Sequence, residues 1–260
     1  MTPALVVGNW KMNGGSAGGV ELARTIVRQR KNNQASVQVA LAPPFTALVS
    51  VKKVLGKSQI KLAAQNCHWE ESGAFTGEIS PSMLAEIGCD FVVIGHSERR
   101  HIFCESEDMI AQKLLAVLRH GMRPILCVGE TIEERRGDQT SAVITRQLDS
   151  ALKGVAEGDI ENIEIAYEPV WAIGTGLNAT AEQINKTHEQ IRDFLDRHFG
   201  DTKGRQVRIL YGGSVKPDNA EMIGRISSVN GVLVGGASLI ADSFGAILRE
   251  FSTYQAQRTL

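Results

Sequence analysis

The sequence lacks a strong excess of charge of either sign, a long apolar run and a low-complexity linker. Its 260 residues include 28 basic and 29 acidic side chains, which gives a formal net charge of −1. This balance argues against a nucleic-acid partner or a membrane partner, because both are usually bound through basic patches. Hydrophobic residues make up 43% of the chain and charged residues 22%, a composition typical of a folded globular protein and not of a disordered one.

Targeting, membrane and metal signals are also missing. No stretch reaches the roughly 18 apolar residues of a membrane-spanning helix, and no basic segment precedes the short apolar run at the start, so we expect a cytoplasmic protein. The histidines His96 and His101 lack H-E-x-x-H spacing, and Cys67-His68 has no second pair, so we predict no metal site. The four cysteines form no C-x-x-C pair and are expected to be reduced thiols: Cys67, Cys89, Cys104 and Cys127.

Short aliphatic runs alternate with segments of helical periodicity. Apolar residues recur on one helical face at Ile110, Leu114 and Val117, and Thr131 with Glu134 fits the capping box that begins a helix, as does Thr180 with Gln183. Eight runs predict strands: 5–8, 37–41, 60–64, 91–94, 125–128, 163–167, 207–211 and 232–234. Strands alternating with helices predict a parallel sheet covered by helices. Eight such units predict an α/β fold, a single (β/α)8 barrel domain over residues 1–260, although an open doubly wound sheet uses the same unit.

Polar residues follow the predicted strands. In a (β/α)8 barrel the active site lies where strands end and βα loops begin. At these positions stand Asn9, Lys11, His96, Glu98 and Glu168. Each alone has a simpler explanation, such as a solvated lysine, a packed histidine or a surface glutamate. Because all of them fall at strand ends, we predict that they share one barrel mouth.

Two glycine pairs follow the last two predicted strands. Gly212-Gly213-Ser214 and Gly235-Gly236 leave backbone N–H groups uncovered beside a helix start, which favours an anion such as phosphate. A tight turn would explain either pair alone. The stretch from Gly174 to Ala179 loosely fits a dinucleotide-binding pattern, but its first glycine does not directly follow the strand, so we predict a hinged loop there.

Longer motifs resemble the triosephosphate isomerase family from the first predicted strand to the last. The motifs are Gly8-Asn9-Trp10-Lys11-Met12-Asn13, Ile94-Gly95-His96-Ser97-Glu98-Arg99-Arg100, Tyr167-Glu168-Pro169-Val170-Trp171-Ala172-Ile173-Gly174-Thr175-Gly176 and Tyr211-Gly212-Gly213-Ser214-Val215. Cys127-Val128-Gly129-Glu130 and Gly73-Ala74-Phe75-Thr76-Gly77-Glu78 fit as well. The departures are small, such as Cys104 where glycine is frequent in the family.

This resemblance implies the interconversion of dihydroxyacetone phosphate and D-glyceraldehyde 3-phosphate without a cofactor, in glycolysis and gluconeogenesis. Glu168 would remove the carbon-bound proton, and His96 would polarise the carbonyl as a neutral imidazole, the pairing for which this family is the standard example. Lys11 would supply positive charge, with Asn9 and Glu98 orienting it. The implied phosphate ligands are backbone groups of Gly174, Ser214, Gly235 and Gly236, covered by a closing loop from Pro169 to Gly176.

The resemblance also implies a homodimer in which the loop around Thr76 enters the neighbouring active site. Two other classes stay open at this point. One is a non-catalytic phosphosugar-binding barrel, in which Glu168 or His96 would be missing, and the other is a different phosphate-binding lyase or synthase barrel. Both glutamate and histidine are present, which favours the isomerase.

Overall fold

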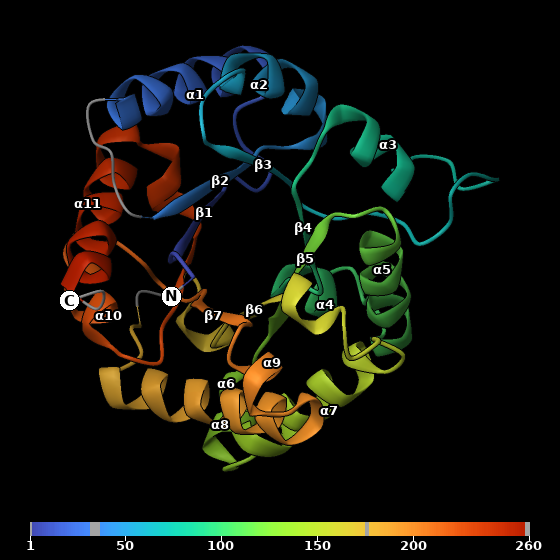
Figure 1. Cartoon of the computed structure of the whole chain (residues 1–260), viewed down its shortest axis with the longest axis vertical. Helices are drawn as coiled ribbons and strands as arrows, with labels where there is room; N and C mark the ends of the chain where they lie inside the picture. The colour runs from blue at the N-terminus through green and yellow to red at the C-terminus, as the bar shows by residue number, and fades with distance from the viewer. Residues whose placement is uncertain (1, 32–36, 175–176, 258–260) are drawn as a thin grey trace.

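Eight parallel strands form one closed barrel in the computed structural model, which describes residues 2–31, 37–174 and 177–257. The strands pair in chain order, and β8 pairs with β1 to close the sheet. Figure 1 shows the helices as a ring around this barrel. The predicted (β/α)8 fold is confirmed, and the open-sheet alternative is wrong because the first and last strands are hydrogen-bonded to each other.

The strands are short and lie within one or two residues of the predicted ends. They are β1 (Leu5–Asn9), β2 (Gln38–Ala42), β3 (Lys61–Ala64), β4 (Phe91–Ile94), β5 (Arg123–Val128), β6 (Glu164–Tyr167), β7 (Arg208–Tyr211) and β8 (Gly231–Val234). Asn9 is the last residue of β1 and does not lie beyond it as predicted, because the ladder to β2 continues through Ala42.

The helices that follow the strands are α1 (Ser16–Lys31), α2 (Leu48–Leu55), α3 (Pro81–Ile87), α4 (Ser97–His101), α5 (Glu107–Arg119), α6 (Ile132–Arg136), α7 (Thr140–Leu152), α8 (Ala181–Phe199), α9 (Asp201–Gly204), α10 (Ala220–Arg225) and α11 (Ala241–Gln257). Four short 3-10 turns are η1 (Phe45–Ala47), η2 (Ile160–Asn162), η3 (Val170–Ala172) and η4 (Gly236–Leu239). None of the helices in the described part of the chain is long and apolar enough to cross a membrane.

Local capping chemistry fixes where two helices begin beside the barrel mouth. The Thr131 hydroxyl accepts from the backbone N–H of Glu134 at 3.3 Å, and the Glu134 carboxylate accepts from the backbone N–H of Thr131 at 2.8 Å. Thr180 and Gln183 repeat this arrangement at the start of α8, at 3.2 and 2.9 Å. Both predicted capping boxes are confirmed. The first N–H groups of a helix have no partner within the helix. Each capping box supplies such partners from side chains and so fixes the conformation in which the loop enters the helix.

Two apolar layers explain why the strand runs have few polar positions. One face of each strand packs outward against the helices, and the other fills the barrel interior. The interior cluster is Leu5, Val7, Ala40, Ala42, Ala63, Phe91, Val93, Ile125, Cys127, Ala166, Leu210 and Leu233. The barrel is therefore a packed core with two separate polar ends.

Candidate active site

The carboxyl ends of the strands surround a cavity of about 300 Å³. Its lining includes nearly all of the residues predicted from the sequence: Asn9, Lys11, His96, Glu168, Gly174, Ser214, Gly235 and Gly236. Glu98 lines an adjoining cavity of about 190 Å³ together with Asn9, Lys11 and His96. The structure thus brings all of the predicted site residues to one mouth.

Glu168 is a buried carboxylate at the tip of β6, with 2% of its surface exposed. Its Oε2 accepts from the backbone N–H of Ser97 at 2.9 Å, and its Oε1 lies 3.1 Å from His96 Nε2. Glycines make room for it: a Cβ on Gly129 would strike the Glu168 carbonyl, and a Cβ on Gly212 would lie 2.8 Å from Glu168 Cγ. Packing and hydrogen bonds therefore hold the carboxylate in one position facing the cavity.

His96 precedes the first turn of α4 and caps it. Its Nδ1 accepts from the backbone N–H of Glu98 at 3.2 Å. A ring nitrogen that accepts has no proton, which places the ring proton on Nε2, 3.1 Å from Glu168 Oε1. Gly95, with φ of +68°, makes the left-handed turn that leads from β4 to this cap. The helix start thus fixes the orientation of the ring, with Nε2 next to the carboxylate.

Lys11 is held by its backbone as well as by its side chain. Its φ of +50° is unusual for a residue with a side chain, and such conformations are concentrated at functional sites. Its Nζ lies 2.6 Å from Glu98 Oε1, and its N–H donates to Asn9 Oδ1 at 3.1 Å. Gln65 Nε2 donates to the carbonyls of Lys11 and Ala42 at 2.9 and 2.8 Å. Sequence reasoning missed Gln65, although it directly follows β3.

The two glycine pairs differ in what requires them. A Cβ on Gly236 would meet no atom within 4 Å, and one on Gly235 would meet only Lys11 Cε at 3.6 Å, so both backbones face open space. At the other pair, Gly212 is required by Glu168, and a Cβ on Gly213 would strike the Tyr211 ring. The open backbone predicted for phosphate is therefore at Gly235 and Gly236, whereas close packing explains the first pair.

Glu130, which the sequence showed only as part of a motif, anchors the start of the loop that follows β6. Its Oε1 accepts from Trp171 Nε1 at 2.9 Å, Tyr167 Oη at 3.1 Å and Arg135 Nη1 at 2.9 Å. Burial, then the Glu130 carboxylate, raises the pKa of the Tyr167 hydroxyl. Thr175 and Gly176 of the predicted closing loop lie outside the described residues.

A buried thiol, Cys127, lies in the barrel interior near the Glu168 carboxylate. Cys127 is fully buried in the barrel interior, and burial followed by the Glu168 charge raises its pKa well above the usual range. All four cysteines are free, as predicted. Within the described ranges, no group of three or more His, Cys, Asp or Glu side chains is placed to hold a metal ion.

The arrangement is suited to moving protons on a small anionic ligand. A carboxylate, an imidazole N–H and an ammonium group border one cavity, and uncovered glycine backbone borders its other end. The carboxylate can exchange a proton with carbon, the imidazole with oxygen, and the ammonium group can stabilise negative charge between them.

The chain is similar to a family model, to proteins of several organisms and to a solved structure that carry the same description. The family model described as triosephosphate isomerase matches residues 4–251. The triosephosphate isomerase of Thermoanaerobacter pseudethanolicus is 46% identical over 248 residues, covering 95% of this chain and 99% of the relative, and that of Geotalea uraniireducens is 43% identical over 249 residues, covering 96% and 99%. The crystal structure of triosephosphate isomerase from Bartonella henselae superposes with a TM-score of 0.87 at 40% identity, covering 96% of this chain and 99% of that one.

The family model spans both the Glu168 and the His96 motifs, and the relatives match nearly end to end. The non-catalytic phosphosugar-binding barrel is therefore set aside in favour of an isomerase. The chain belongs to the triosephosphate isomerase family.

Proposed function

We propose that the cavity at the carboxyl end of the barrel interconverts dihydroxyacetone phosphate and D-glyceraldehyde 3-phosphate through an enediolate. The observation that supports this most directly is the 3.1 Å contact between Glu168 Oε1 and His96 Nε2 in a cavity that Lys11 also lines. An isomerisation between adjacent carbons needs a base for carbon and a proton carrier for oxygen, and these two groups meet at that point.

Each predicted residue has a role in this proposal. Glu168 takes a proton from one carbon and returns it to the neighbouring carbon, so no oxidation of the substrate results. His96 passes its Nε2 proton to the carbonyl oxygen and regains a proton from the adjacent hydroxyl. Lys11 stabilises the negative charge of the enediolate. Asn9 and Glu98 position Lys11 through its backbone N–H and its Nζ.

The phosphate group occupies the glycine end of the cavity in this proposal. Gly235 and Gly236 present open backbone at the start of η4, and Gly174 and Ser214 line the same space. Small residues let N–H groups approach an anion that a side chain would hold away. The reaction requires no cofactor, because every proton that leaves one atom of the substrate returns to another.

Replacing the base tests the assignment. We expect Glu168→Gln to keep the fold and to lower kcat by at least ~10²-fold, because an amide cannot accept the carbon-bound proton. Steady-state kinetics in both directions measure this, with inorganic phosphate inhibition showing that the anion end is intact. Glu182→Gln on α8, which removes an exposed carboxylate, is the control. Near-normal turnover of Glu168→Gln would overturn the assignment.

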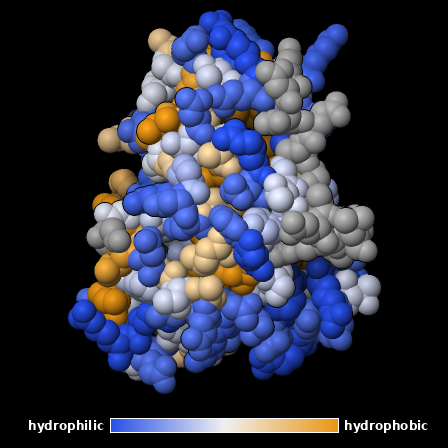
Figure 2. Space-filling view, turned by 90° about the vertical axis from the view of Figure 1, so that its left-hand side faces the viewer, coloured by the Kyte–Doolittle hydropathy of each residue, from blue (hydrophilic) through white to orange (hydrophobic). Residues whose placement is uncertain are grey.

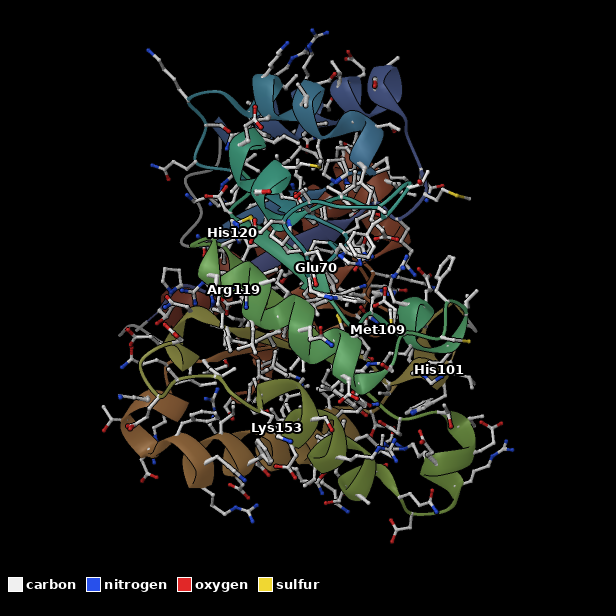
Figure 3. The ribbon with its side chains drawn as sticks, turned by 90° about the vertical axis from the view of Figure 1, so that its right-hand side faces the viewer. Glu70, His101, Met109, Arg119, His120 and Lys153 are labelled. Atoms are coloured by element: carbon white, nitrogen blue, oxygen red, sulfur yellow. The ribbon has the colours of Figure 1, made fainter. Side chains whose placement is uncertain are left out.

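We also propose a homodimer formed through the loop 67–78 around Thr76. This loop extends outside the ring of helices (Figure 1), and Figure 3 faces that side, with Glu70 of the loop next to α5. Seven of the nine large apolar side chains exposed in the described residues fall between residues 12 and 103: Met12, Phe45, Val49, Phe75, Met83, Ile102 and Phe103. The side bearing α11 shows only scattered apolar patches among hydrophilic residues (Figure 2).

Phe75 offers a test of this dimer. Phe75 is 42% exposed, and its ring centroid lies 4.3 Å from that of His68, so the opposite face of the ring can contact a partner. We expect Phe75→Asp to dissociate the dimer and to lower activity, because a carboxylate would be buried without a partner. Light scattering and kinetics on the same sample measure both effects. Phe75→Leu, which stays apolar, should remain dimeric, and a fully active monomer would contradict the proposal.

We further propose that residues 1–260 form one domain and that the enzyme works in the cytoplasm. The family match over residues 4–251 supports a single domain, because it leaves little sequence for another one. Four free thiols support a reducing compartment. Cell fractionation tests the location, and limited proteolysis that releases a stable fragment would contradict the single domain.

A further inference from the structure

A second cavity, of about 920 Å³, lies at the opposite end of the barrel. It is bordered by the residues that begin the strands: Gln38 begins β2, Lys61 begins β3, Arg123 begins β5 and Arg208 begins β7. Arg30 reaches the same cavity from α1. The apolar cluster inside the barrel separates this floor cavity from the active site, so it has no part in the isomerisation.

Two of these arginines share a single buried carboxylate. Glu164, which is fully buried, receives Arg208 Nε at 2.8 Å and Arg208 Nη2 at 2.5 Å. Arg123 Nη2 lies 2.8 Å from the same carboxylate. Two guanidinium groups against one carboxylate leave one positive charge in excess at the floor of the barrel.

Two further cations border the cavity. Lys61 Nζ donates to Asp90 Oδ1 at 2.8 Å, and its side chain, which lines the cavity, is 44% exposed. Arg30 Nη2 donates to the carbonyl of Val37. Burial lowers the pKa of Arg30, a sign that its charge is partly removed from water.

The balance of charge in the floor cavity is positive. Four cationic side chains line it, whereas the carboxylates are Glu161 on its rim and Glu164 and Asp90 within the ion pairs. Amide side chains of Gln59, Asn162 and Gln206 complete the lining. A concave surface with a net positive charge concentrates the electric field and attracts anions. The ion pairs stabilise the barrel end, and four cations against three carboxylates leave one positive charge in excess.

We propose that this floor cavity binds a small polyanion, a metabolite with two or more phosphate or carboxylate groups. Its volume is about three times the 300 Å³ of the active-site cavity, which suits a ligand larger than a triose phosphate. Its cations come from α1, β3, β5 and β7, and positions spread around the barrel end suit a ligand with more than one anionic group. Arginine and lysine are the side chains that bind such groups most strongly.

Calorimetric titration with inorganic pyrophosphate tests the proposal. Pyrophosphate can also enter the active site, so we expect two sites per chain in the wild type, of which only one is displaced by substrate analogues. Arg30→Gln and Lys61→Gln should each weaken the second site by at least ~10-fold, the effect of losing one charged hydrogen bond. Both variants should keep the kcat, the KM and the competitive inhibition of the wild type.

A matched control distinguishes binding in the floor cavity from nonspecific attraction of pyrophosphate to the positive charges of the protein. Arg28→Gln removes the same charge from the exposed face of α1 without lining the cavity, and it should retain both sites. The proposal is overturned by a single pyrophosphate site in the wild type, by unchanged affinity in either cavity variant, or by equal weakening in Arg28→Gln. Lys61→Gln keeps the test valid if Arg30→Gln fails to fold, because Lys61 is substantially exposed.

Discussion

The two ends of this barrel are both charged, but they hold their charges in different ways. At the carboxyl end, Lys11 lies in the loop after β1 and His96 lies at the start of α4. Both side chains line the cavity. At the amino end, Glu164 and Arg208 are the opening residues of neighbouring strands and pair through two hydrogen bonds. Charges built into strands stabilise the sheet, whereas charges on loops stay available to a ligand.

This difference separates effects on stability from effects on catalysis. A variant at the amino end should unfold more easily and still react normally once folded. A variant at the carboxyl end should keep its stability and lose activity, because loops tolerate changes that a strand ladder does not.

The largest effect is expected at the amino end. Glu164→Gln removes the carboxylate that Arg123 and Arg208 share, and we expect it to lower the free energy of unfolding by about 3–5 kcal/mol, the cost of leaving buried charges without their partner. Urea unfolding at fixed protein concentration measures this, and kcat per folded chain should not change. Glu161→Gln, at an exposed position on the same floor, should be nearly neutral. Equal stability of Glu164→Gln and Glu161→Gln would show that the buried ion pairs at the amino end do not stabilise the barrel.

The next effect is expected at the carboxyl end. A side chain at Gly236 has open space, so Gly236→Asp should fold, but its charge would repel the phosphate group. We expect KM to rise by about 10²-fold, which corresponds to about 3 kcal/mol, with unfolding little changed. Gly236→Ala adds the Cβ without charge and should have a smaller effect. Wild-type inhibition by inorganic phosphate should be competitive and should weaken in parallel; an unchanged KM in Gly236→Asp would place the phosphate elsewhere.

The smallest effect is expected from a buried histidine that belongs to neither charged end of the barrel. His188 on α8 is fully buried with Nδ1 3.2 Å from the carbonyl of Ser228, and burial lowers its pKa to about 4. The unfolded chain takes up a proton near pH 6.5 and the folded chain does not, so stability is complete above pH 6.5 and falls as the pH decreases toward 4. We expect a loss of about 2 kcal/mol between pH 6.5 and 5 from this group.

Unfolding curves across this pH range measure the effect. His188→Gln should flatten the slope, whereas His101→Gln, at an exposed position, should leave it unchanged. A slope that persists in His188→Gln would assign the pH dependence to other groups. Activity at each pH separates this stability effect from titration at the mouth.

Local patterns in the sequence were enough to predict the barrel and most of its mouth. The apolar runs gave strands within two residues of their ends, and the capping pairs at Thr131 and Thr180 were read directly. Glu168 and His96 were found because a residue that ends a parallel strand lies at the carboxyl end in any such sheet. These features depend on neighbours a few residues away, which is why periodicity and spacing reveal them.

Only the closed tertiary structure decided which distant residues meet. Glu164 and Arg208 are 44 residues apart, and their pairing follows from the register of β6 against β7. The same applies to Glu130, which accepts a hydrogen bond from Trp171, 41 residues away, and to Gly212, whose missing side chain makes room for Glu168. No local pattern encodes these contacts, because strand register and barrel closure are set by the packing of the whole core, and a one-residue slip would send each side chain to the other face.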